Sequence, residues 1–152
     1  MDNQATKKHK RRDSREVAFA LIFEWGFRQD ENLDDVISQA IAARAIEADS
    51  FALNLASVTV QNISAIDNMI QKYSVKWKLN RIPKVTLAVL RMSFCEMSFL
   101  DDIPVGATIN EAVELVKKYA TEDDSAYVNG LLGQYERERM GNSVPNPARS
   151  EG

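Results

Sequence analysis

Two helix patterns follow one another in residues 109–132, with the sequence INEAVELVKKYATEDDSAYVNGLL. In its first half, apolar residues recur at intervals of three and four, which places them on one face of an α-helix: Ile109, Ala112, Val113, Val116 and Ala120. Acidic residues come early and lysines late, an order that the helix dipole favours. The pattern predicts a helix with one buried face and a polar face made of Asn110, Glu111, Glu114, Lys117 and Lys118.

A second helix is predicted after the polar turn TEDDS. Asp123, Asp124 or Ser125 can accept the free backbone amides at its start, and its apolar stripe consists of Val128, Leu131, Leu132 and Tyr135. Gly130 inside this helix costs about 1 kcal/mol relative to alanine, so we expect another part of the backbone to approach closely there. The two helices together predict a hairpin.

The first long helix is predicted to begin at Asp13. Asp13 and Glu16 have the spacing of a capping box, and an apolar run follows them. This run carries two stripes, one of Val17, Leu21 and Trp25 and one of Phe19, Phe23 and Phe27. Core packing is the commoner cause of a second stripe and a partner surface is the alternative, with Phe23 as the residue that tests them.

Three further helices follow from apolar spacing. We predict a short helix around residues 36–41, one continuous helix from Phe51 to Tyr73, and a helix from Val85 to Phe99 with Pro83 in its first turn. The last is apolar nearly all round, which is typical of a helix surrounded by others. No segment alternates like a strand, so the sequence predicts an all-α bundle of about six or seven helices.

Length and composition indicate one folded domain. A chain of 152 residues with 45% hydrophobic residues can bury one core. Residues 1–12 are almost devoid of apolar side chains and 140–152 are rich in Gly, Pro and Ser. We therefore expect a flexible basic tail over 1–12, a helical domain over 13–139 and a disordered tail over 140–152.

The single cysteine, Cys95, excludes an internal disulfide framework and indicates a reducing compartment, where it is expected to be a small buried hydrophobe. Neither a signal peptide nor a membrane-spanning run is recognisable, so we expect a cytoplasmic protein without a membrane partner. The net charge is −3, yet residues 1–15 hold six Lys and Arg residues against two Asp residues. Positive charge is therefore concentrated at one end.

The motifs of common enzyme classes are missing from the sequence. It has no phosphate-binding glycine loop, no nucleophile elbow and no metal-spaced His or Cys set, and His9 is isolated among lysines. The acidic pairs at 101–102 and 123–124 fall where turns and helix caps explain them. We expect a binding module that uses no metal or cofactor and is not an enzyme.

Binding to RNA requires cations for the phosphates and aromatic or polar groups for unstacked bases. The sequence offers the cationic run Lys10, Arg11, Arg12 and Arg15, and the hairpin residues Lys117, Lys118, Tyr119 and Tyr127. Tyr73 cannot be placed beside them from sequence. Tyr119 is expected either to stack on a base or to fill the end of the hairpin.

The INEAVEL, KKY and YVNG strings, with an Arg-rich start leading into SREVAFALIFEW, resemble the NusB family of transcription antitermination factors over about residues 10–137. The resemblance implies two packed helical subdomains that bind a short single-stranded boxA RNA together with NusE, a ribosomal protein. In the antitermination complex of RNA polymerase, such factors suppress termination during ribosomal RNA synthesis. The implied RNA contacts are Arg11, Arg12, Arg15, Tyr73, Arg91, Lys117, Tyr119 and Tyr127.

The implied NusE contacts lie near Phe23 and Thr86, and Thr86 stands where some relatives have an acidic residue. Arg15 lies half inside the first helix and can equally be structural. Two other functions remain open: a helical protein-interaction scaffold that works through the Phe19–Phe23 stripe, and the helical RNA-binding module of an RNA-modifying enzyme. A homodimer is also possible.

Overall fold

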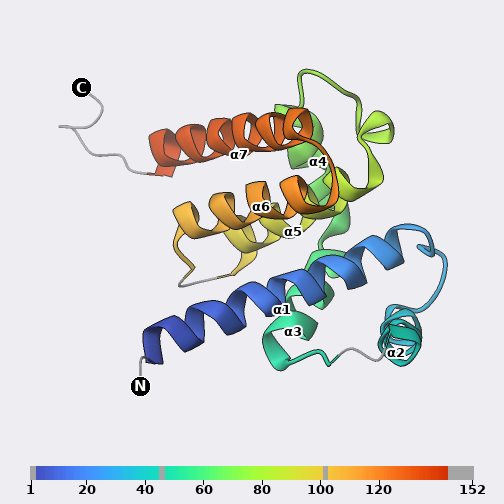
Figure 1. The fold of residues 1–152 in the computed structure, drawn as a ribbon. Coiled ribbons are helices and arrows are strands. Elements are labelled where there is room, and N and C mark those ends of the chain that lie inside the picture. Colours follow the sequence, from blue (N-terminus) through green and yellow to red (C-terminus); the bar gives the residue numbers. More distant parts are fainter. Residues whose placement is uncertain (1–2, 45–46, 101–102, 144–152) are drawn as a thin grey trace.

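The computed structural model describes residues 3–44, 47–100 and 103–143, and every regular element within these ranges is helical (Figure 1). This confirms the predicted all-α class and the number of helices. The elements are α1 (Asn3–Gly26), α2 (Leu33–Arg44), α3 (Ser50–Gln61), α4 (Ile63–Tyr73), a 3-10 turn (Leu79–Arg81), α5 (Lys84–Phe99), α6 (Val105–Tyr119) and α7 (Glu122–Ser143).

Helix α5 is the centre of the fold. Every residue from Thr86 to Met97 is buried, and the helix packs against α1, α3, α4, α6 and α7. Its apolar sequence on all sides is explained by this position, as predicted. Each fully buried large side chain, such as Phe94 or Leu90, contributes roughly 1.5–3 kcal/mol of hydrophobic free energy.

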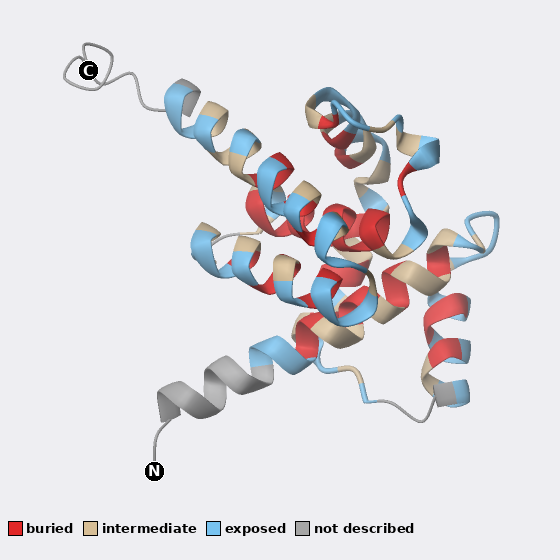
Figure 2. Ribbon diagram, turned by 45° about the horizontal axis from the view of Figure 1, so that its top comes forward, coloured by how far each residue is buried: buried red, intermediate tan, exposed pale blue. Residues whose placement is uncertain are grey.

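The other helices form two packed groups around α5. Helix α1 packs against α2 and α3 on one side, while α6 and α7 form the predicted hairpin on the other (Figure 1). Figure 2 shows that buried residues lie on the faces that the helices turn toward one another. Ala112 and Val116 of α6 are buried, as are Val128, Leu131 and Leu132 of α7, which confirms the core of the hairpin.

Two local predictions for the hairpin are wrong. Helix α7 begins at Glu122, and the Thr121 hydroxyl oxygen accepts the Asp124 amide at 3.0 Å, so the cap lies earlier than any of the three predicted residues. Gly130 is exposed, and a Cβ built there meets nothing within 4 Å among the described residues. A close approach inside the protein therefore does not explain this glycine.

Two predicted helix boundaries also differ. Helix α1 is continuous from Asn3, so Asp13 is an interior residue and not the first. The long helix predicted over 51–73 is broken at Asn62, whose side-chain amide donates to the Val58 carbonyl at 2.8 Å and competes with the backbone ladder. The division of the chain into two tails and a domain stays a prediction.

The two stripes of α1 have different environments. Leu21 and Trp25 of the first stripe are buried, whereas the second runs from buried Phe19 through half-buried Phe23 to exposed Phe27. The second stripe therefore leaves the core along its length. Within the described part of the chain, no helix is long and apolar enough to cross a membrane.

Candidate nucleic-acid and protein interface

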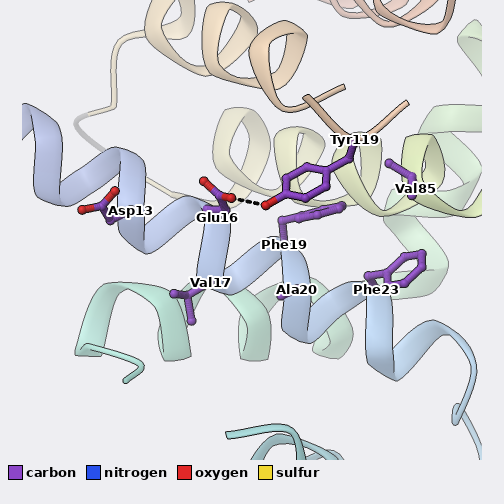
Figure 3. A pocket seen from close by; sticks show the side chains of 8 residues that line it. All are labelled: Asp13, Glu16, Val17, Phe19, Ala20, Phe23, Val85 and Tyr119. Atoms are coloured by element: carbon purple, nitrogen blue, oxygen red, sulfur yellow. Dashed lines mark hydrogen bonds between the residues drawn. The ribbon is translucent and has the colours of Figure 1, made fainter. Parts of the chain in front are cut away.

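An apolar groove of about 450 Å³ lies where α1 passes the start of α5 and the end of α6 (Figure 3). Phe19 and Phe23 lie four residues apart and therefore share one face of α1. Because α6 ends at Tyr119, it does not cover that face completely. The lining residues are Asp13, Glu16, Val17, Phe19, Ala20, Phe23, Val85 and Tyr119.

A row of four aromatic rings extends along this groove and beyond it. The ring centroids of Tyr119 and Phe19 are 5.3 Å apart, those of Phe19 and Phe23 are 6.1 Å apart, and those of Phe23 and Phe27 are 5.1 Å apart. Of the two inner rings, Phe19 is buried and Phe23 is half-buried, whereas Tyr119 and Phe27 at the two ends are 45% and 59% exposed. The second stripe thus joins the core to an open surface, and its role as a partner surface stays a prediction.

A charged edge, defined as Arg12, Glu16, Glu111 and Lys118, borders the groove where α1 meets α6. Arg12 binds Glu111 in a bidentate manner, with both nitrogen–oxygen distances at 2.9 Å. Lys118 donates from Nζ to Oε2 of Glu16 at 2.7 Å, and the Tyr119 hydroxyl donates to the same oxygen. Two of the predicted RNA-binding cations therefore have carboxylate partners within the protein.

These contacts shift the pKa of each group involved at Glu16. Burial raises the pKa of Glu16, but the hydrogen bonds from Lys118 and Tyr119 outweigh it and the net pKa is lowered. The hydrogen bond with Glu16 raises the pKa of Lys118 and that of Tyr119. At neutral pH Glu16 is therefore a carboxylate, Lys118 an ammonium group and Tyr119 a neutral phenol.

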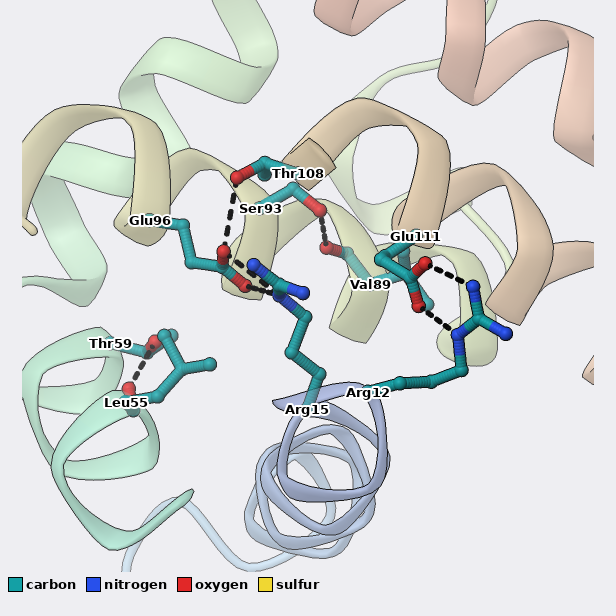
Figure 4. A network of polar contacts seen from close by, with 9 residues as sticks. All are labelled: Arg12, Arg15, Leu55, Thr59, Val89, Ser93, Glu96, Thr108 and Glu111. Carbon is teal, nitrogen blue, oxygen red and sulfur yellow. Dashed lines mark hydrogen bonds and ion pairs between the residues drawn. The ribbon is translucent and has the colours of Figure 1, made fainter. Parts of the chain in front are cut away.

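Arg15 lies inside the protein. It is 5% exposed, and its guanidinium donates to Glu96 of α5 at 2.9 and 3.0 Å (Figure 4). The Thr108 hydroxyl of α6 donates to the same carboxylate at 3.0 Å. This arrangement conflicts with the predicted RNA contact of Arg15 and supports the structural role that the sequence left open.

Arg91 and Thr86 are also buried. This burial conflicts with the predicted contact of Arg91 with RNA and with the predicted contact of Thr86 with NusE. The Arg91 guanidinium forms a bidentate pair with Asp67 of α4, with both distances at 2.9 Å. Thr86 is fully buried, and its hydroxyl has no hydrogen-bond partner among the described residues. Both residues follow the apolar spacing of α5, which carries them into the core with their neighbours.

The structure brings Tyr73 and Tyr127 together in a second groove of about 440 Å³, the tyrosine groove, between α4 and α7. The Tyr127 ring also meets Trp77 edge-on, with centroids 4.9 Å apart. The groove is lined by Lys72, Tyr73, Val75, Lys76, Ala126, Tyr127, Gly130, Leu131, Gln134 and Glu138. Half-buried rings beside two lysines suit stacking on bases and neutralisation of phosphates.

Two further predicted RNA-binding residues, Arg11 and Lys117, do not belong to the charged edge. Arg11 is exposed, and its guanidinium lies 3.9 Å from the centroid of the Phe51 ring of α3. Lys117 lines a further groove between α6 and α7, which shares Ala126 with the tyrosine groove. The side chain of Lys10 lies outside the described residues.

Sequence reasoning missed the acidic partners of the predicted cations. Glu111 was expected on the solvent-facing side of its helix, yet it is buried against Arg12. Helical spacing carries no signal for this pairing, because Arg12 approaches from a helix almost a hundred residues earlier. Lys72 of the tyrosine groove was also missed, although the sequence indicates it. A lysine directly beside a tyrosine is a pattern typical of RNA-binding surfaces.

The described residues include no group of three or more His, Cys, Asp or Glu side chains placed to hold a metal ion. Cys95 is buried, and this burial raises the pKa of its thiol to about 11. The thiol is therefore protonated near neutral pH and is a poor nucleophile.

Comparison with known sequences identifies relatives over almost the whole chain. The profile of the NusB family matches residues 12–137. The transcription antitermination protein NusB of Natranaerobius thermophilus is 40% identical over 129 residues, which cover 82% of this chain and 92% of the relative. Residues 12–137 include the apolar groove, the charged edge and every residue that lines the tyrosine groove except Glu138.

Two solved structures share the fold. T. maritima NusB superposes with a TM-score of 0.72 at 32% identity, over 93% of this chain and 97% of that one. A chain from the crystal structure of the antitermination factors NusB and NusE in complex with dsRNA superposes with a TM-score of 0.75 at 28% identity, over 84% of this chain and 96% of that one. The arrangement of helices around α5 is therefore shared by proteins of known structure.

Proposed function

The chain belongs to the NusB family, and from this premise we propose that it is a transcription antitermination factor that binds boxA-like RNA together with NusE. It acts without covalent chemistry, in the cytoplasm, as part of the antitermination complex of RNA polymerase. Its effect is to suppress termination during the synthesis of ribosomal RNA.

The observation that carries this proposal is the adjacency of two surfaces of different chemistry on α1. The apolar groove offers aromatic and aliphatic side chains, while the charged edge beside it offers Arg12 and Lys118. Glu16 belongs to both surfaces, and Tyr119 lines the groove and donates a hydrogen bond to Glu16. A protein partner suits the first surface and an RNA phosphate backbone suits the second.

We assign RNA binding to the exposed members of the predicted set. Arg11, Arg12, Lys117 and Lys118 supply positive charge, and Tyr119 offers an exposed ring. Tyr73 and Tyr127 supply a second aromatic site in the tyrosine groove. Arg15 and Arg91 support this surface from inside the fold through their buried ion pairs.

We assign NusE to the apolar groove. Phe23 is half-buried and lines the groove, so it can be covered by a partner without unfolding the protein. Thr86 lies one residue after Val85, which lines the same groove, but Thr86 itself faces the core. Its role is therefore to support the start of α5 and not to contact NusE.

Titration of a labelled boxA-like RNA with and without NusE tests the proposal. We expect binding that is tighter for boxA than for a scrambled strand and tighter again when NusE is present. A duplex of the same sequence belongs in the comparison, because the related NusB and NusE structure contains dsRNA. NusE binding with no preference for boxA would instead favour the protein-interaction scaffold.

Two further measurements separate the remaining alternatives. Mass spectrometry of the RNA recovered after incubation should show an unchanged mass, whereas a shifted mass would favour an RNA-modifying activity. Light scattering of the free protein and of its RNA complex tests for a homodimer. If the dimer interface overlaps the binding surfaces, RNA and NusE should dissociate it.

A further inference from the structure

Glu16 is the residue at which the apolar groove and the charged edge meet. Its Oε2 accepts a hydrogen bond from Lys118 Nζ at 2.7 Å. The same oxygen accepts a second hydrogen bond from the Tyr119 hydroxyl, which Figure 3 shows. Glu16 belongs to α1, whereas both donors lie at the end of α6. One carboxylate oxygen thus accepts hydrogen bonds from two groups to which we assign RNA binding.

The ion pair between Glu16 and Lys118 is open to exchange. The side chain of Lys118 is 59% exposed and that of Glu16 is 30% exposed. Ion pairs at such exposure are weak, since water and dissolved ions compete for both partners. A phosphate group can therefore replace Glu16 at Lys118, and a cation can replace Lys118 at Glu16.

We propose that Glu16 couples the two binding surfaces by exchanging its counter-ion. A basic side chain of NusE, seated in the apolar groove, takes the place of Lys118 at Glu16, and the released Lys118 neutralises an RNA phosphate. This inference rests on the proposed function, because it requires both NusE and RNA as ligands.

Charge complementarity defines the segment of NusE that fits. The floor of the groove is apolar, with Phe19, Phe23 and Val85, while Asp13 and Glu16 place carboxylates at one end. The matching segment presents apolar side chains followed by a lysine or an arginine. RNA and this segment then favour each other's binding by the same factor, because coupling between two sites is reciprocal.

The other ion pair of the charged edge, between Arg12 and Glu111, cannot exchange its counter-ion in this way. Glu111 binds Arg12 with both of its oxygens, its side chain is only 9% exposed, and it does not line the apolar groove. A partner in the groove therefore has no route to Glu111. Glu16 is the carboxylate of this edge that faces both ligands.

Glu16→Gln tests the proposal through the coupling factor, defined as the affinity for boxA-like RNA at saturating NusE divided by the affinity without NusE. The amide cannot hold Lys118 as a counter-ion, so Lys118 is released before NusE arrives. We expect RNA affinity without NusE to rise about two- to fivefold, which is the range for an exposed ion pair, and the coupling factor to fall by the same amount. The salt slope without NusE should steepen by about 0.7, as for one more phosphate contact.

Glu31→Gln is the matched control. Glu31 forms an exposed ion pair with Arg28 after the end of α1, and it lines none of the grooves described above. This variant removes the same charge and a similar surface pair, so its coupling factor should equal that of the wild type. An equal change in both variants would show that only net charge matters and would overturn the proposal.

Lys118→Gln provides an independent test from the other partner. It frees Glu16, so NusE affinity without RNA should rise about two- to fivefold, while the coupling factor falls. An unchanged coupling factor in either Glu16→Gln or Lys118→Gln overturns the proposal, and so does weaker RNA binding by Glu16→Gln. These results leave the proposed function standing if the wild type binds RNA and NusE, whereas a wild type that binds neither refutes both.

Discussion

Arg15 of α1 and Glu96 of α5 form a buried ion pair at 2.9 Å, and Thr108 of α6 donates to the same carboxylate. Three helices from distant parts of the chain therefore meet at one acidic side chain, which is 2% exposed. Such a pair is costly to break from one side, because the remaining charge stays in a poorly solvated position.

Arg15→Ala should destabilise the fold by roughly 3–5 kcal/mol, since it leaves Glu96 buried without its counter-ion. Urea unfolding followed by circular dichroism measures this loss. The control is Lys117→Ala, because its partner Glu114 is 56% exposed and stays solvated without the lysine, so this variant should lose far less stability. Equal losses for the two variants would contradict the structural role of Arg15.

Phe23→Asp should leave the protein folded and weaken NusE binding, because Phe23 is half-buried in the wall of an open groove. Binding to RNA alone should persist. Calorimetric titration with NusE measures the effect. Phe99→Asp, at the exposed end of α5, is the matched control and should bind NusE normally. A folded Phe23→Asp protein with full NusE affinity would refute the assignment.

Tyr119→Ala should lower the affinity for boxA-like RNA by roughly 1–3 kcal/mol if a base stacks on the exposed ring. Lys117→Ala should weaken boxA and scrambled RNA about equally, because phosphates carry no sequence information. Fluorescence titrations with both RNAs compare the variants. If the folded fraction of Tyr119→Ala binds RNA with the affinity of the wild type, the Tyr119 ring has only a structural role, which is to pack against Phe19.

Gly130→Ala should stabilise α7 by about 0.5–1 kcal/mol, because the new methyl group meets nothing within 4 Å and alanine favours the helix. Gly130 lines the tyrosine groove, so the same methyl group should hinder a base that approaches the helix backbone there. Gly141→Ala in the same helix also has open space and lies outside the groove. It should stabilise the protein without changing RNA affinity, and an identical RNA affinity in both variants would argue against binding at the tyrosine groove.

Cys95 should make the protein less stable at alkaline pH. Burial raises the pKa of its thiol from 9.0 to about 11, so above pH 9 the unfolded chain loses a proton that the folded chain keeps. The free energy of unfolding should fall as the pH rises from 9 to 11, with about 1.4 kcal/mol lost at pH 10. Cys95→Ala lacks this component, so urea unfolding of both proteins at pH 8 and pH 10 isolates it. Parallel declines would contradict the raised pKa.

We could predict the helical class, the central place of α5 and the core of the hairpin from the amino-acid sequence alone. These features depend on apolar spacing within one element, and such spacing is a local property that can be read along the chain. Val128, Leu131 and Leu132 are buried as their intervals predict. Apolar spacing predicted the ends of the helices less well. At such an end, a side chain such as Asn62 competes for the backbone hydrogen bonds of the helix.

Which charged residues remain available to a ligand depends on the tertiary structure. Arg12 and Arg15 are three residues apart in one basic run, yet the first lies at the surface against Glu111 and the second is buried against Glu96. Their partners come from α6 and α5, far along the chain, so no local pattern distinguishes them. The same holds for Glu16, because a carboxylate acquires its role from the lysine and the groove that folding places beside it.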